Sequence, residues 1–82
     1  MERIIGKVQY KDKNGVDWIW QVIVEDEYYY SKFGIVGTEL KIAPKERCKN
    51  EDDAVKSAEA LYGLKMAVLN NGKYSMVKEI KI

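Results

Sequence analysis

The segment from Val16 to Glu25 constrains the fold of this chain more than any other. Its side chains alternate between two faces, and both faces carry apolar residues. A strand that is apolar on both faces has to be covered on both, which is typical of the centre of a sheet. We therefore expect a central strand with both of its tryptophans in the core. One face holds Trp18, Trp20, Val22 and Val24, and the other holds Ile19, Gln21 and Ile23.

Further strand signals lie on either side of this segment. Residues 3–10 alternate with a period of two, and Asn14-Gly15 then tolerates positive φ angles, so a hairpin is predicted. After Asp26-Glu27, the aromatic segment 28–34 predicts a third strand. Residues 38–48 predict a fourth strand, in which Pro44 marks an edge or an end because proline has no N–H to donate.

A single helix is predicted from residue 51 to the Asn70-Asn71-Gly72 group, which favours a C-terminal cap. Asn50 is a good N-cap, and the three acidic residues after it suit the positive end of the helix dipole. Apolar residues then recur every three or four positions up to Leu69. Gly63 lies within the helix, where glycine costs about 1 kcal/mol relative to alanine, so we expect a close contact or a weak point there.

These elements predict an α+β fold: a four- to five-stranded, mostly antiparallel sheet with one helix packed on it. The tail from Tyr74 to Ile82 is a candidate for the last strand. A chain of 82 residues is long enough for one compact domain and too short for two. We therefore expect a single domain over residues 1–82.

The composition excludes several classes of protein. No stretch approaches the roughly 20 apolar residues of a membrane span, and the first residues are too polar for a signal peptide, so we expect a cytoplasmic protein. Cys48 is the only cysteine and histidine is absent, so neither an internal disulfide nor a Cys/His zinc site is expected. We predict no cofactor and no bound metal.

The charge is distributed unevenly along the chain. Residues 31–50 contain five basic and two acidic residues, while the whole chain has a net charge of only +1. Acidic clusters flank this basic segment at residues 25–27 and 51–53. A basic segment beside aromatic residues favours nucleic-acid binding, because cations neutralise phosphates and aromatic rings stack on bases. The alternative is that these cations only keep an edge strand and a loop in solvent.

The middle of the chain and its helix resemble the WGR domain of poly(ADP-ribose) polymerases and related bacterial proteins, over about 55 residues. In that family an aromatic strand ending in acidic residues leads to a strand that closes on Trp-Gly-Arg-Val/Ile-Gly-Thr. The corresponding residues here are the strand from Trp18 to Asp26 and then Phe33-Gly34-Ile35-Val36-Gly37-Thr38. The segment from Asn50 to Tyr62 is similar to the family's helix.

The resemblance implies a fold and a partner. WGR domains of the polymerases bind DNA near a break and pass that signal to neighbouring domains, with the tryptophan and arginine among the contributing residues. Here Phe33 replaces the tryptophan and Ile35 replaces the arginine. Phe33 retains a ring that can stack, whereas Ile35 cannot make charge-assisted hydrogen bonds. Gly34, Gly37 and Thr38 are expected to shape the turn and not to contact the partner.

Two functional hypotheses follow, and both are non-enzymatic. In the first, the domain binds nucleic acid, DNA in particular. In the second, it is a small inhibitor or adaptor that binds a larger protein, with Ile35 as an apolar anchor unless that side chain packs inward. The protein is expected as a monomer or a homodimer, away from membranes. Both hypotheses use the same residues, namely Lys32, Phe33, Ile35, Lys41, Lys45, Arg47 and Lys49.

Overall fold

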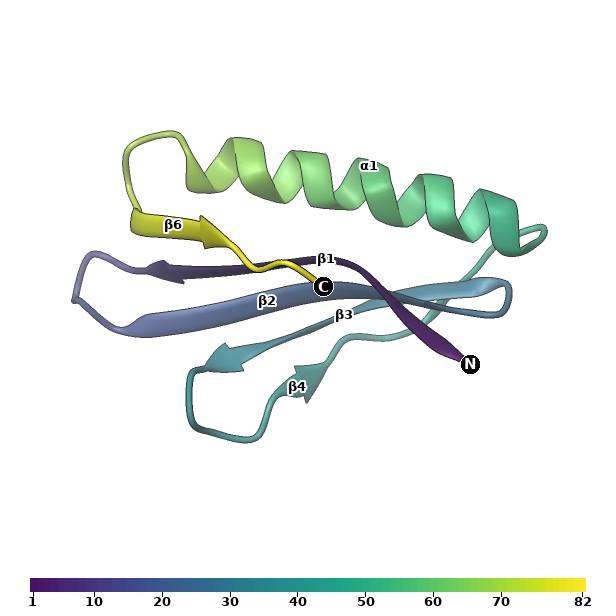
Figure 1. Ribbon diagram of the computed structural model, residues 1–82, viewed down its shortest axis with the longest axis horizontal. Helices are drawn as coiled ribbons and strands as arrows, with labels where there is room; N and C mark the ends of the chain where they lie inside the picture. The colour runs from purple at the N-terminus through teal and green to yellow at the C-terminus, as the bar shows by residue number, and fades with distance from the viewer.

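A computed structural model describes residues 1–82 as one antiparallel sheet with one helix lying along it (Figure 1). The long strands and the helix run in nearly the same direction in that view. The predicted α+β class, with one helix packed on an antiparallel sheet, is confirmed. The elements in chain order are β1 (Glu2–Lys11), β2 (Asp17–Glu25), β3 (Tyr28–Ile35), β4 (Lys41–Ile42), β5 (Glu46–Arg47), α1 (Glu51–Leu69) and β6 (Ser75–Glu79).

The strand order is β4-β3-β2-β1-β6, with β5 also paired to β3. β2 lies in the middle, as its two apolar faces predict, and Val22 at its centre is fully buried. Trp20 is paired with Val8 of β1 on one side and with Phe33 of β3 on the other. Trp20 is 6% exposed, as expected for a core residue, whereas Trp18 is only half-buried.

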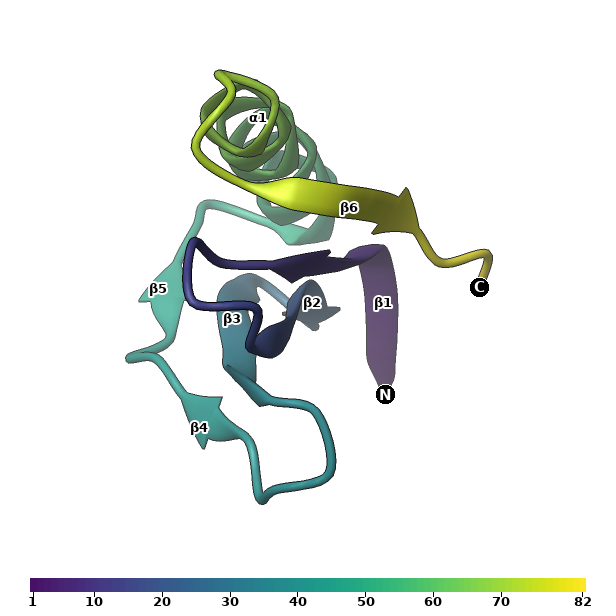
Figure 2. The same cartoon turned by 90° about the vertical axis from the view of Figure 1, so that its left-hand side faces the viewer.

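The predicted fourth strand is divided into two short pieces. β4 pairs with Lys32 and Phe33, and β5 pairs with Tyr28 and Tyr29, so the two pieces follow one edge of β3. Pro44 lies between them and has no N–H to donate, which interrupts the ladder. Figure 2 shows β4 at the end of the molecule farthest from α1.

α1 begins where the capping signals predict. The side chain of Asn50 accepts a hydrogen bond from the backbone N–H of Asp53 at 2.9 Å, and the first turn is acidic. The helix ends at Leu69, and Asn70 donates its backbone N–H to the carbonyl of Met66. Small and apolar side chains line the buried face of α1 and pack on β1 and β2; the fully buried ones are Ala54, Ala58 and Leu69.

The close approach between helix and sheet occurs at Gly6 and not at Gly63. A Cβ atom at Gly6 would lie 2.4 Å from Cδ1 of Tyr62, whereas a Cβ at Gly63 would meet nothing within 4 Å. Of the two alternatives expected at Gly63, the structure excludes the close contact and leaves the weak point, namely the helix-propensity cost of glycine. Gly6 instead lets the ring of Tyr62 lie directly on β1, next to a bulge between Ile4 and Gly6.

Candidate binding surface

The structure does not bring the seven predicted binding residues together on one face. Directly paired residues of neighbouring antiparallel strands point to the same side of a sheet. Phe33 is paired with Trp20 and with Lys41, which places Lys41 on the side of the sheet that α1 covers. Lys32 is paired with Gln21, which places it on the opposite face.

Lys45 and Arg47 are held by the acidic turn between β2 and β3. The ammonium of Lys45 lies 2.8 Å from Glu25 and 5.1 Å from the ring centroid of Tyr30, and Nε of Arg47 lies 2.9 Å from Glu27. The hydrogen bond from Lys45 lowers the pKa of Glu25, and the same bond raises the pKa of Lys45. Glu27 likewise raises the pKa of Arg47. Two cations of the basic segment therefore neutralise two of the three carboxylates in one of the acidic clusters beside it.

Two further cations of the basic segment are exposed and carry no ion pair. Lys41 lies in β4, and Lys49 lies in the loop that precedes α1. The thiol of Cys48, next to Lys49, is half-buried and lies 3.9 Å from the hydroxyl of Ser57. Lys41 and Lys49 are thus available to a ligand, while Cys48 is turned toward the helix.

The turn after β3 presents apolar side chains to solvent. Ile35 is 41% exposed and Val36 is 43% exposed. Gly37 has a φ of +90°, which favours glycine, and Thr38 donates its hydroxyl to the carbonyl of Ile35 at 2.7 Å. A Cβ at Gly34 would lie 3.1 Å from the side chain of Leu40. These contacts fix the shape of the turn and leave Ile35 at the surface.

Next to this turn, aromatic side chains from three strands line a cleft of about 220 Å³, here called the inner cleft. The ammonium of Lys65 on α1 lies 5.5 Å from the ring centroid of Tyr10 and 5.7 Å from that of Trp20. Burial lowers the pKa of Lys65, and no carboxylate lies within ion-pair distance of it. The residues of the inner cleft are Tyr10, Trp18, Trp20, Ser31, Phe33 and Lys65.

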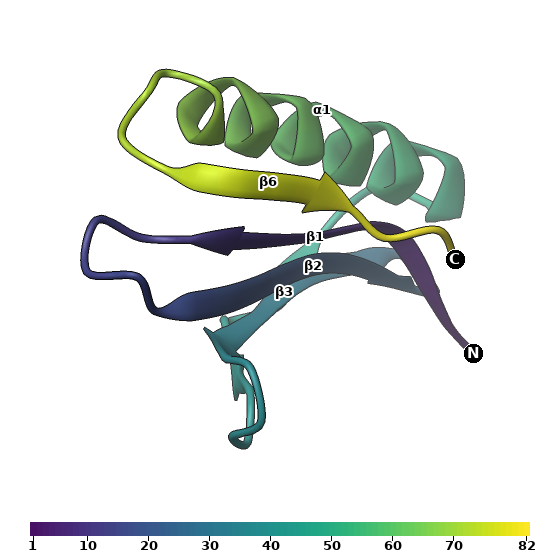
Figure 3. The same ribbon diagram turned by 60° about the vertical axis from the view of Figure 1, so that its left-hand side comes forward.

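A second aromatic cleft, here called the outer cleft, adjoins the inner one because Tyr10 and Trp18 line both. Its volume is about 230 Å³, and its residues are Tyr10, Asp12, Trp18 and Tyr74. Asp12 precedes the β1–β2 turn and Tyr74 follows the α1–β6 turn. Figure 3 shows these two turns at the same end of the molecule.

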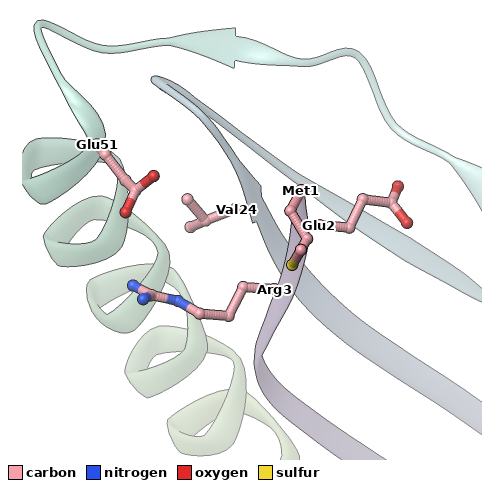
Figure 4. Close-up of a pocket in the computed structure, with 5 residues that line it drawn as sticks. All are labelled: Met1, Glu2, Arg3, Val24 and Glu51. Carbon is pink, nitrogen blue, oxygen red and sulfur yellow. The ribbon is translucent and has the colours of Figure 1, made fainter.

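A third cleft of about 220 Å³ lies where β1 begins beside the start of α1 (Figure 4). Arg3 extends from β1 toward α1, and Glu51 is the first residue of that helix, whereas Glu2 points away from the helix. Val24 and Met1 complete the lining. Residues of both charges line this cleft, so it has no clear preference for an anion, and it contains none of the predicted binding residues.

Sequence reasoning misses most of the aromatic surface. Strand alternation assigns Trp18 to the core together with Trp20, and it does not identify Lys65 or Tyr74 as a binding residue. The sequence contains one indication that Trp18 is less buried than Trp20. Trp18 lies at the start of its strand, close to the Asn14-Gly15 turn, where a side chain is covered less completely than at the centre of a strand. No local pattern marks Lys65 or Tyr74.

Comparison with protein families, curated proteins and solved structures finds no match to this chain. The resemblance to WGR domains therefore stays a prediction. α1 lacks the long apolar stretch that a membrane-crossing helix needs. The chain also has no group of three acidic, cysteine or histidine side chains placed to hold a metal ion.

Proposed function

We propose that this domain binds nucleic acid, single-stranded DNA in particular, and that it does not catalyse a reaction. The observation that carries the proposal is the inner cleft, where Trp18 and Phe33 lie beside the unpaired ammonium of Lys65. Stacking of a base on an aromatic side chain contributes about 1–3 kcal/mol and tolerates any sequence. The rings lie in a cleft and not on a protruding surface, so an unpaired base reaches them more easily than a base within a duplex.

Cations on both sides of the cleft can follow the backbone of the strand. Lys41 lies opposite Phe33 in the sheet and is exposed, and Lys65 lies on the helix side. Lys45 and Arg47 lie away from this cleft, because Arg47 is paired with Tyr28 and Lys45 lies over Tyr30, and both tyrosines point to the face of the sheet opposite α1. Each phosphate contact releases counterions, so affinity should fall with added salt.

Binding without catalysis agrees with the state of the acidic side chains. Glu25 and Glu27 are engaged by Lys45 and Arg47, as described above. Asp53 and its acidic neighbours lie in the first turn of α1, where they stabilise the helix. Neither cluster therefore supplies two unengaged carboxylates for acid-base chemistry beside an aromatic cleft.

The test is fluorescence anisotropy of labelled single-stranded, duplex and nicked DNA at two salt concentrations. We expect the Lys41→Gln/Lys65→Gln variant to bind more weakly and to show a smaller salt dependence, with the slope reduced by about one for each lysine that no longer neutralises a phosphate. The matched control, which also removes two charges, is Lys56→Gln/Lys78→Gln, two exposed lysines that line none of the clefts described above. Absence of binding at low salt, or equally weakened binding in both variants, would contradict the proposal.

A second function, docking on a larger protein as an inhibitor or adaptor, is favoured by a different observation. Ile35, Val36 and Ile42 are exposed around the β3–β4 turn, with Ile42 59% exposed. Exposed apolar side chains are common at protein interfaces, and these three lie in or beside one turn. The test is cross-linking from the β3–β4 turn. A protein that cross-links to the native domain and not to the Ile35→Asp variant would support docking, if the domain also fails to bind DNA.

A further inference from the structure

The outer cleft combines aromatic rings in two orientations. Tyr10 of β1 and Tyr74 before β6 meet edge to face, with ring centroids 5.3 Å apart and planes inclined at 84°. Trp18 of β2 provides the third ring that lines the cleft. Three aromatic side chains from three separate parts of the chain therefore border one shallow space of about 230 Å³. Ring faces carry negative electrostatic potential, so such a site favours a cation over a neutral or anionic group.

The one charged group that lines the outer cleft is a carboxylate held in place by three hydrogen bonds. Oδ2 of Asp12 accepts from Nε1 of Trp18 at 2.8 Å. Oδ1 accepts from the backbone N–H groups of Asn14 at 2.9 Å and Val16 at 3.0 Å. These bonds, that from Trp18 first, lower the pKa of Asp12, so the side chain is negative at neutral pH. Its charge adds to the potential of the rings.

The chain already places one cation against these rings. The ammonium of Lys65 lies over Tyr10 and Trp20 on the side of the inner cleft, with no carboxylate partner. The outer cleft uses Tyr10 again and is lined by no lysine. Lys13 and Lys73 line a neighbouring cleft that shares Asp12 and Tyr74 with the outer cleft. The aromatic surface thus holds a cation in one half and leaves the other half open.

We propose that the outer cleft binds a methylated ammonium group, such as the trimethylammonium group of a small quaternary amine or of a trimethylated lysine side chain. A methylated cation suits this cleft because its methyl groups pack on Tyr10, Trp18 and Tyr74 and need no hydrogen-bond acceptor. A primary ammonium would require acceptors, and the oxygens of Asp12 already receive three hydrogen bonds. This binding does not depend on nucleic-acid binding.

The decisive experiment compares a cation with a neutral molecule of the same shape. Choline and 3,3-dimethylbutan-1-ol differ in the charge of one group, and each is titrated into the 15N-labelled domain. We expect choline to shift the indole N–H signal of Trp18, with that of Trp20 as an internal reference. The neutral alcohol should bind about tenfold more weakly, because it lacks the attraction of a cation to ring faces. A trimethyl-lysine peptide, with its unmethylated form as control, distinguishes a protein source of the group from a small molecule.

Two variants locate the site. Tyr74→Leu removes a ring that lines the outer cleft and not the inner one, and Phe33→Leu removes a ring that lines the inner cleft and not the outer one. We expect choline binding to weaken several-fold in Tyr74→Leu and to be retained in Phe33→Leu. Equal binding of choline and the neutral alcohol, no saturable shift with choline, or weaker binding only in Phe33→Leu would each overturn the proposal. If a variant does not fold, the comparison of choline with the neutral alcohol on the native chain still tests the proposal.

Discussion

Replacing Gly6 with alanine tests the contact that joins the helix to the sheet. A Cβ at this position would lie 2.4 Å from Cδ1 of Tyr62 and 2.6 Å from its Cγ and Cε1. Relaxed carbon contacts are about 3.5–4.0 Å, so the ring has to move by about 1 Å. It is not free to do so, because it stacks on Trp20 and its hydroxyl donates to Glu79 at 2.8 Å. Overpacking of this kind costs about 1–3 kcal/mol, and we expect Gly6→Ala to lower the free energy of unfolding by about 2 kcal/mol.

The assay is denaturant-induced unfolding followed by tryptophan fluorescence, with Gly63→Ala as the control. Gly63 has open space around a Cβ, so its replacement should raise the free energy of unfolding by roughly 0.5–1 kcal/mol through helix propensity. In a Tyr62→Ala background the clash is absent and Gly6→Ala should cost nothing. An equal cost of Gly6→Ala in both backgrounds would refute the steric explanation, since the two residues would then not be coupled.

Three further predictions concern backbone strain and pH. Met76 has a φ of +55° and is 72% exposed, so Met76→Gly should raise the free energy of unfolding by roughly 0.5–1 kcal/mol in the same assay; a decrease would contradict strain at this position. The pKa of Asp12 is lowered in the folded state from an ordinary value of 3.8. Its ionised side chain therefore contributes to the free energy of unfolding above pH 3.8, and this contribution is lost as pH falls through the lowered pKa. The indole N–H shift of Trp18 should follow that acid titration in the native domain and be insensitive to it in Asp12→Asn. Burial, together with the bond to Glu79, raises the pKa of Tyr62 from 10.0 to about 12, so stability should fall as pH rises from 10 to 12, and Tyr62→Phe should reduce that fall.

The fold could be predicted largely because its signals are local. The start of α1 depends on Asn50 and on a hydrogen bond from a residue only three positions later. The first two strands follow from alternation over nine or ten residues and the third from its aromatic composition, and both signals are independent of the rest of the chain. The division of the edge strand at Pro44 is visible in the sequence as a missing donor, although the sequence does not show that both pieces pair with β3.

The candidate site could not be predicted in the same way, because its contacts join distant positions. Lys45 and Glu25 are 20 residues apart and meet only because β5 follows β3 beside the β2–β3 turn. Along the sequence the two charges belong to separate basic and acidic clusters, whereas in the structure they cancel. The position of Gly63 in the helix predicts a close contact or a weak point, and only the structure decides between them, because the close contact occurs where Tyr62 meets β1, at Gly6.

The two aromatic clefts are not independent, because Tyr10 and Trp18 line both. The indole of Trp18 is fixed by its hydrogen bond to Asp12, so one carboxylate orients a ring for both clefts. Asp12→Asn removes the charge and leaves one side-chain acceptor in place of two, so it can keep either the indole bond or the two backbone bonds. Because the charge is lost in either case, the substitution should weaken a cation in the outer cleft more than a base in the inner one. A base and a methylated cation would compete for the shared ring of Trp18, so each should reduce the affinity of the other by the same factor. Competition between choline and single-stranded DNA therefore connects the two proposals, although either can fail without the other.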